Sequence, residues 1–276
     1  MKRLIVTADD FGAAVAVNEA VERAHREGLL TAASLMVTGD AVADAVARAR
    51  AMPSLGVGLH VVLVEGHPAL PPAKIPDLVD GSGLFRTDMV RTAMAIFARP
   101  TARAQLRAEV EAQFARFAAT GLPLDHVNAH KHFHLHPTIA STILEVGRRY
   151  GMKAIRAPIE TKAVLNEIEP GSGGIDIAKP WALLIRRRMR AAGMLAPDQV
   201  FGLAWSGGLT TARLRGLIAN LPDGLTEIYA HPATGPYPGS APGYAYAEEL
   251  TALTDDLAKD RVLRDGVALG RFVDFV

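Results

Sequence analysis

Short apolar runs alternate along the chain with longer stretches in which apolar residues recur at helical spacing. The short runs predict strands at residues 4–8, 33–38, 56–63, 126–129, 154–156, 200–204, 227–230 and 270–275. The longer stretches predict helices at residues 17–27, 41–51, 102–119, 138–150, 182–192, 211–220 and 247–256. Strands separated by helices are typical of parallel βαβ units, so the sequence predicts an α/β fold. Seven to eight mostly parallel strands favour an irregular, TIM-barrel-like (β/α) barrel, with an open doubly wound sheet as the alternative.

Two proline-rich segments interrupt this pattern, at residues 64–86 and 232–243. Long loops of α/β folds usually lie on the functional face, so we expect both segments to lie near a site. The sequence shows no linker or internal repeat that would divide it. We therefore expect residues 1–276 to form a single domain.

The composition narrows the classes of function. Thirty Lys and Arg residues balance 29 Asp and Glu residues, and this net charge of +1 argues against nucleic acid as the main partner. The chain has no cysteine, which excludes disulfides, thiolate metal sites and cysteine nucleophiles. The apolar run at residues 4–6 is too short for a secretory signal, and no stretch approaches the length of a membrane span. We therefore expect a cytoplasmic protein.

Acidic and histidine side chains coincide with the predicted strand ends. Asp9 and Asp10 follow the first strand, and His60 lies in the third. Adjacent carboxylates repel each other unless a cation or a proton intervenes, although Asp is also favoured at helix N-caps. A lone strand histidine is most often structural, but histidine is also the commonest metal ligand. These three residues are therefore candidates that need a further observation.

That observation is a histidine-rich stretch at residues 128–137, NAHKHFHLHP, which holds four of the chain's nine histidines. Imidazoles at this density indicate a metal site, a proton shuttle or both. Asp10, His60 and His130 together offer one carboxylate and two imidazoles, each from the end of a different strand. Such a set leaves coordination positions open for water and substrate. His231 also follows a predicted strand and falls on the same face.

Other classes of protein use related sets of residues. Two histidines and one carboxylate are also the facial triad of non-haem iron oxygenases, but an oxygenase does not need the adjacent Asp9. A metal-dependent phosphoesterase commonly uses two ions and more carboxylates. A sugar- or metal-binding module would not explain a base-like Asp9 beside a ligand. These classes are the alternatives to a metal-dependent hydrolase.

The chain resembles the YdjC-like carbohydrate deacetylases. The resemblance rests on residues 7–12 (TADDFG), 58–60 (GLH), 130–134 (HKHFH) and 231–232 (HP), in order along the whole chain. Residues 125–137 and 60–66 suggest, more narrowly, the hopanoid biosynthesis-associated branch. This resemblance implies an irregular (β/α) barrel and metal-dependent removal of an N-acetyl group from an amino sugar. The sugar would be N-acetylglucosamine on a hopanoid lipid or, alternatively, in a soluble oligosaccharide.

The resemblance also implies roles for individual residues. Asp10, His60 and His130 would bind one divalent metal ion, and Asp9 would be the general base. Arg156, His132 and His134 would contact the substrate. His231 would belong to the active site, and we assign it as the general acid, with His132 and His134 as alternatives. The chain departs from the family pattern at Asn128-Ala129, where relatives often have Asp-Ser or Asp-Thr.

The partners expected from the sequence are a metal ion, an amino-sugar substrate and a membrane surface. Two imidazole ligands favour zinc, with magnesium as the alternative. In residues 180–195, an apolar helical face lies beside a basic flank; it comprises Trp181, Leu184, Ile185 and Met189, next to Arg186, Arg187, Arg188 and Arg190. This pattern is typical of an ordinary barrel helix, and also of a segment that contacts anionic lipid at the inner membrane surface. A homodimer is a further expectation.

Overall fold

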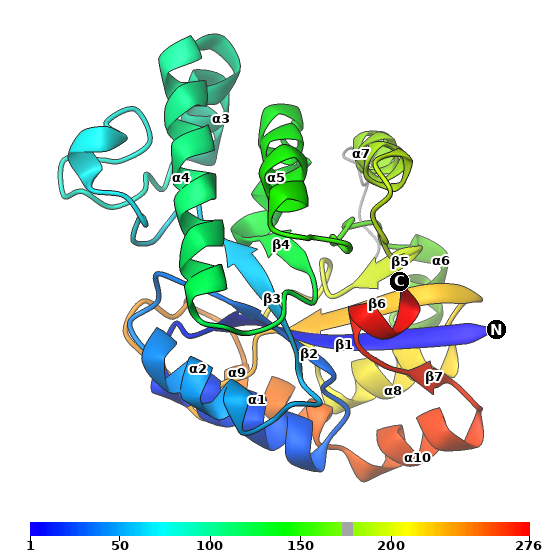
Figure 1. Cartoon of the computed structure of the whole chain (residues 1–276). Helices are drawn as coiled ribbons and strands as arrows, with labels where there is room; N and C mark the ends of the chain where they lie inside the picture. The colour runs from blue at the N-terminus through cyan, green and yellow to red at the C-terminus, as the bar shows by residue number, and fades with distance from the viewer. Residues whose placement is uncertain (173–178) are drawn as a thin grey trace.

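A curled parallel β-sheet forms the centre of the protein (Figure 1). The computed structural model describes residues 1–172 and 179–276. The strands in these residues are β1 (Lys2–Phe11), β2 (Ala32–Leu35), β3 (Gly56–Val61), β4 (Val127–Ala129), β5 (Gln199–Phe201), β6 (Gly224–Ala230) and β7 (Ala268–Leu269). Their order is β4-β3-β2-β1-β6-β5, with β7 paired to β1, and every pairing is parallel.

Helices surround this sheet, with α1, α2, α8 and α10 on one side and α4, α5 and α7 on the other (Figure 1). The α-helices are α1 (Val15–Glu27), α2 (Val42–Arg50), α3 (Met89–Ala98), α4 (Pro100–Ala119), α5 (Pro137–Arg149), α6 (Lys162–Ile168), α7 (Lys179–Ala191), α8 (Thr211–Ala219), α9 (Tyr246–Leu253) and α10 (Asp256–Arg264). Three 3₁₀ segments complete the described elements: η1 (Pro72–Lys74), η2 (His130–Leu135) and η3 (Phe272–Phe275).

An extended segment, residues 153–159, links the two ends of the sheet. The Arg156 N–H donates to the Val127 carbonyl of β4 at 3.0 Å, and the Val200 N–H of β5 donates to the Ile159 carbonyl at 2.8 Å. The strand predicted at residues 154–156 is therefore present only as isolated bridges. The arrangement confirms the irregular (β/α) barrel and not the open doubly wound sheet.

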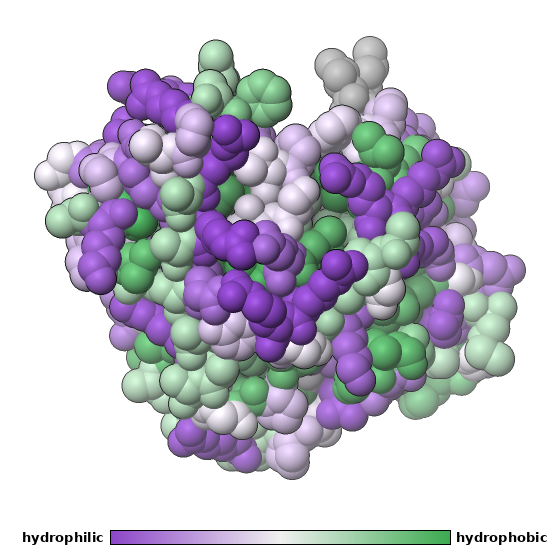
Figure 2. Space-filling view, turned by 45° about the horizontal axis from the view of Figure 1, so that its top comes forward, coloured by the Kyte–Doolittle hydropathy of each residue, from purple (hydrophilic) through white to green (hydrophobic). Residues whose placement is uncertain are grey.

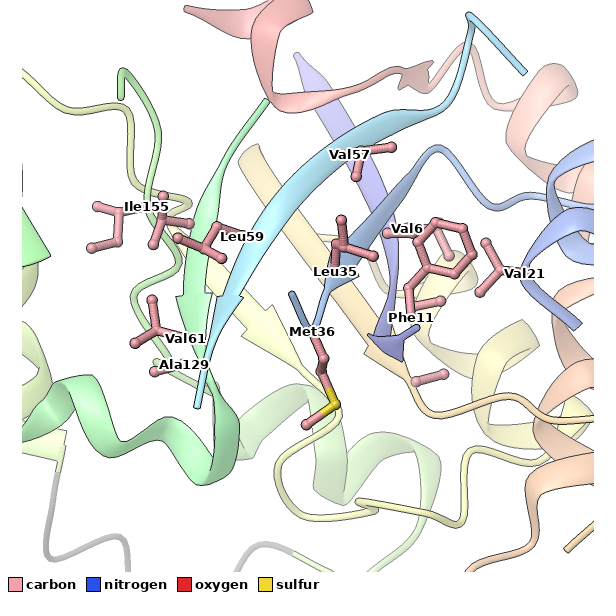
Figure 3. Close-up of a cluster of buried hydrophobic side chains, with 14 of the residues drawn as sticks. Val6, Phe11, Val21, Leu35, Met36, Val57, Leu59, Val61, Ala129 and Ile155 are labelled. Atoms are coloured by element: carbon pink, nitrogen blue, oxygen red, sulfur yellow. The ribbon is translucent and has the colours of Figure 1, made fainter. Parts of the chain in front are cut away.

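The core lies between the sheet and its helices. Figure 3 shows Val6 and Phe11 of β1 beside Val21 of α1. It also shows Leu59 of β3 next to Ile155. All five side chains are buried. Burial of one such side chain stabilises the fold by about 1.5–3 kcal/mol.

A glycine brings β3 close to β4 just before His60. A Cβ atom at Gly58 would lie 2.5 Å from the His126 ring and from the His126 carbonyl oxygen. Because any larger residue would push the two strands apart, this glycine helps to set the spacing of the strand ends that follow.

Three helices were not predicted, and one predicted strand is wrong. Helices α3, α6 and α10 fall outside the predicted ranges, and α10 follows α9 after a break at Asp255, whose side chain caps α10. Residues 270–275 form the 3₁₀ segment η3 and not a strand. Arg271 and Asp274 close that turn through side-chain and backbone hydrogen bonds, which compete with sheet pairing. None of the helices in the described ranges is long and apolar enough to cross a membrane.

The structure divides the apolar face predicted on α7 between the core and the surface. Ile185 and Met189 are buried in the core, whereas Trp181 and Leu184 are 41% and 44% exposed. Arg190 pairs with Asp198 at 2.7 Å, and the Trp181 indole N–H donates to the Leu135 carbonyl at 2.7 Å. In Figure 2, purple hydrophilic side chains surround a small green area below the grey atoms, over α7. The buried residues pack as in an ordinary barrel helix, and contact of the exposed residues with lipid stays a prediction.

Candidate active site

A cleft of about 1000 Å³ lies at the carboxyl ends of the strands. It is lined by six of the residues singled out in the sequence: Asp9, Asp10, His60, His130, His132 and His231. Arg156 and His134 are fully buried and do not line it. The cleft is at the upper end of the roughly 300–1000 Å³ common for ligand pockets, so it has room for more than one sugar ring.

The last residues of β1 place two adjacent carboxylates at this cleft. Successive side chains of a regular strand point to opposite faces. Here the pairing of β1 with β2 shifts between Ala8 and Phe11, and Asp10 has a positive φ of 62°. Such a bulge redirects one side chain. Asp9 and Asp10 therefore both line the cleft, although they are neighbours in a strand.

Asp10, His60 and His130 form a compact cluster of potential metal ligands. Asp10 Oδ1 lies 3.3 Å from His60 Nε2 and 3.3 Å from His130 Nδ1, and the two ring nitrogens are 3.4 Å apart. Among the residues that the structure describes, the buried Asp10 Oδ1 has no hydrogen-bond partner. An orphaned buried carboxylate oxygen between two imidazole nitrogens is a donor set that fits a divalent cation.

Asn128 fixes the chemical form of His60. Its Nδ2 lies 3.0 Å from Asp9 Oδ1, and its Oδ1 lies 2.7 Å from His60 Nδ1. Because the Asp9 carboxylate can only accept, the amide must donate to Asp9 and accept from His60. His60 therefore carries a proton on Nδ1, so Nε2, which faces Asp10 and His130, is the ring nitrogen that could bind a cation. Ser34 completes the arrangement, 2.9 Å from Asn128 Nδ2.

The buried side chain of Arg156 forms an ion pair with Asp9 on the side away from the cleft. Its guanidinium donates to both Asp9 oxygens, at 2.5 and 3.0 Å, and to Glu227 Oε1 at 2.7 and 2.9 Å. Burial by itself would raise the pKa of Asp9, but Arg156 outweighs it and holds the pKa well below its usual range. Removing one partner of a buried ion pair costs about 3–5 kcal/mol. The Asp9 carboxylate is thus ionised and fixed in orientation.

The histidines of η2 have different surroundings. His132 Nε2 lies 2.9 Å from the Tyr229 hydroxyl, and burial together with nearby Arg156 holds the pKa of His132 well below its ordinary value. His134 Nε2 donates to the Arg156 carbonyl at 3.0 Å, and burial with the same arginine lowers the pKa of His134 to about 3. Both imidazoles are therefore neutral at physiological pH.

Backbone strain also concentrates at the cleft. Among the described residues, the non-glycine residues with positive φ are Asp10, Glu65, Lys131 and His132. All four line the cleft, and each left-handed residue costs about 1–2 kcal/mol. Strain of this kind is retained where the surrounding structure holds functional side chains in place.

His231 follows β6 directly and is half-buried. Its N–H donates to Glu249 Oε2 at 2.5 Å, and its ring packs against those of Tyr229 and Tyr244, with centroids 5.6 and 5.2 Å away. The ring atom Nδ1 is buried without a hydrogen-bond partner. The backbone of His231 is therefore fixed by a hydrogen bond, while its ring is held by aromatic contacts with described residues.

Several residues of the site were not found from the sequence. Glu227 and Tyr229 lie in β6, and Asn128 was noted only as a departure from a pattern. The one available signal for Glu227 is a charged residue inside an apolar strand, which needs a buried partner. Asn128 gives a comparable signal, since it is a polar residue in β4 immediately before the histidine-rich stretch.

The family model described as YdjC-like protein matches residues 3–264. This chain belongs to the YdjC-like family. Within that family, a carbohydrate deacetylase from Geobacillus stearothermophilus is 32% identical over 275 residues, which cover 98% of this chain and 97% of the relative. A chitooligosaccharide deacetylase from Proteus mirabilis is 27% identical over 282 residues, 99% of this chain and 98% of the relative.

The fold of this YdjC-like chain is also found in a solved structure. A protein from Enterococcus faecalis, described as a candidate cellobiose-phosphate cleavage protein, superposes with a TM-score of 0.78 and 23% identity. The match covers 100% of this chain and 99% of that one. This likeness supports the barrel architecture.

Proposed function

We propose that this YdjC-like protein hydrolyses the N-acetyl group of an amino sugar, using a divalent metal ion and Asp9 as general base. The observation that carries the proposal is the position of Asp9, which is fixed by Arg156 directly beside the cluster of Asp10, His60 and His130. The names of the two relatives, carbohydrate deacetylase and chitooligosaccharide deacetylase, agree with it.

The donor set favours zinc over magnesium. Two of the three ligands, His60 and His130, are imidazoles, which suit zinc, whereas magnesium is usually bound by oxygen ligands. When bound there, the ion would polarise the acetyl carbonyl and acidify a water molecule.

In the proposed reaction, Asp9 accepts the proton of that water. Its low pKa keeps it ionised at physiological pH, so it is always ready to accept, but it is also a weak base. The water oxygen then forms a bond to the carbonyl carbon, and the C–N bond breaks with a proton transferred to nitrogen. Arg156 acts as a positioning residue in this scheme, because it reaches Asp9 and not the cleft.

We assign the proton donor for the leaving nitrogen to His231. Of the three candidate acids, His134 lies outside the cleft lining, and the lowered pKa of His132 keeps that ring neutral. His132 lines the cleft and is proposed to contact the substrate through its ring. His134 is a positioning residue, because its Nε2 donates a hydrogen bond to the Arg156 carbonyl.

The His231→Ala variant is expected to retain its metal and to lose turnover to a smaller extent than an Asp9 variant. The loss should depend on pH, because the wild-type reaction needs a protonated donor that the variant lacks. Turnover measured against pH for both proteins tests this. An unchanged profile in the variant argues against the assignment of His231.

The charges of the cleft indicate an uncharged sugar. Lys131 is the sole Lys or Arg among the described residues that line it, and Lys131 pairs with Glu65. The carboxylates of Asp40 and Asp80 line it as well. A phosphorylated sugar would meet uncompensated negative charge, whereas the amine released by deacetylation would be stabilised. Tyr237 and Tyr244 also line the cleft and offer rings for packing against a sugar.

We propose N-acetylglucosamine on a hopanoid lipid as the substrate, with soluble N-acetylglucosamine oligosaccharides as the alternative. The lipid-linked form is suggested by the resemblance of residues 60–66 and 125–137 to the hopanoid-associated branch. Comparison of the two substrates at equal sugar concentration distinguishes these forms.

The purified protein supplied with zinc is expected to release acetate from N-acetylglucosamine conjugates. A chelator should abolish the release, and added zinc should restore it, because the cluster of Asp10, His60 and His130 would then be filled again. A 6-phosphorylated N-acetylglucosamine serves as the control and should react more slowly. The absence of acetate from every unphosphorylated conjugate would contradict the proposal, and activity with redox-silent zinc excludes an oxygenase.

A further inference from the structure

Helix α3 carries an exposed apolar stripe that the proposed reaction does not use. Val90, Met94 and Phe97 are 71%, 67% and 68% exposed. Their spacing of four and three residues places them on one face of the helix. The opposite face is anchored by Thr92 and Ile96, which are buried. The outer face of α3 is therefore apolar without a covering element among the described residues.

Arginines outnumber acidic side chains around this stripe. From residue 88 to residue 108 the sequence contains four arginines and one acidic residue, Asp88, whose side chain caps α3 by accepting from the Arg91 N–H. Arg91 and Arg103 are exposed and form no ion pair with the described residues, whereas Arg99 reaches Asp77 at 3.4 Å. An apolar stripe flanked by arginines is the pattern of a surface that lies in the interface of an anionic bilayer.

We propose that the α3 stripe, Val90, Met94 and Phe97, docks the protein on an anionic membrane surface. A second copy of the chain fits the stripe poorly, because a two-fold interface would bring the free arginines of both copies together. The stripe belongs to the α3–α4 hairpin, which stands away from the sheet at the top of Figure 1. A projecting convex helix suits insertion into a fluid layer better than the broad, flat contact of a protein partner.

Docking through α3 would bring the cleft close to the bilayer. Leu84, Phe85 and Thr87 line the cleft, and α3 begins two residues after Thr87. The nearness of the cleft to the bilayer matters for a lipid-linked sugar only if the proposed function is right. The docking itself does not depend on that function. Vesicle binding is measured without substrate, so a failure of docking and a failure of deacetylation are observed separately.

The test uses flotation of the full-length protein with vesicles of phosphatidylcholine, with and without phosphatidylglycerol. We expect binding only to the vesicles that contain phosphatidylglycerol, with loss of the bound fraction at high salt. The double variant Met94→Gln/Phe97→Gln and the double variant Arg91→Gln/Arg103→Gln should each lose that binding. The matched control Leu257→Gln/Leu263→Gln removes two exposed leucines from α10, which are 60% and 78% exposed, and should bind as wild type.

Three results would overturn the proposal. The first is no binding of the wild-type protein to anionic vesicles at low salt, and the second is equal loss of binding in the α10 control. The third is a wild-type dimer in light scattering that the α3 variant converts to a monomer, which would assign the stripe to self-association. Thermal unfolding of all variants shows whether a loss reflects the surface or the fold.

Discussion

Replacement of His60 or His130 by alanine is expected to abolish stoichiometric zinc binding and to reduce acetate release to background. Each variant leaves two of the three donor atoms that lie 3.3–3.4 Å apart. Even groups that only orient a ligand cost about 10–100-fold in metal affinity, so loss of a ligand should cost more. Elemental analysis of the purified variants and titration with zinc measure this directly.

The comparison needs a histidine of the same cleft that is not a ligand. His67 lines the cleft but lies outside the cluster, and His67→Ala should keep its zinc. Asn128→Ala should be intermediate, because His60 would lose the acceptor that holds its proton on Nδ1. Stoichiometric zinc in either His60→Ala or His130→Ala would show that the ligand set is wrong.

The Asp9→Asn variant is expected to keep its metal and to lose about 10²–10⁴-fold in turnover, the usual cost of removing a general base. The amide cannot accept the proton of water, while Asp10 and the two histidines are unchanged. Arg156 stays paired with Glu227 in the variant, which limits the loss of stability. Turnover, zinc content and thermal unfolding are measured on the same preparation.

The control for this variant is Asp80→Asn, which removes another carboxylate that lines the cleft. Its turnover of an uncharged substrate should fall far less than that of Asp9→Asn. The pH dependence provides a second check: because Arg156 lowers the pKa of Asp9, moderate acidification leaves Asp9 ionised. A fall in wild-type turnover at moderately acidic pH would therefore be caused by the protonation of groups other than Asp9. Near-wild-type turnover in metal-loaded Asp9→Asn would remove Asp9 from the role of base.

The elements that the sequence missed have physical reasons in common. Helix α3 is apolar on both its buried and its exposed face. It therefore lacks the alternation of apolar and polar faces by which a helix is recognised in a sequence. Helix α10 depends on the Asp255 cap, which divides what reads as a continuation of α9. The last segment, residues 270–275, has the composition of a strand, but η3 forms because local hydrogen bonds between Arg271 and Asp274 replace sheet pairing.

The sequence by itself determined the parallel α/β fold, favoured the barrel over an open sheet, and placed the three candidate metal ligands. Apolar strand runs alternating with helices require parallel strands, and the carboxyl ends of parallel strands meet at one edge. For that reason the pattern of the chain alone places Asp10, His60 and His130 together, since each follows or ends a different strand.

Only the tertiary structure decided how the side chains around those residues are used. The bulge that turns Asp10 beside Asp9 depends on the pairing of β1 with β2. Arg156 and Asp9 are 147 residues apart in the chain, and their contact beneath the cleft follows from the closure of the barrel. Spacing along a sequence records which strand a residue follows. It does not record the direction of a side chain at a bulge or its partner across a buried layer, because both are set by contacts between distant segments.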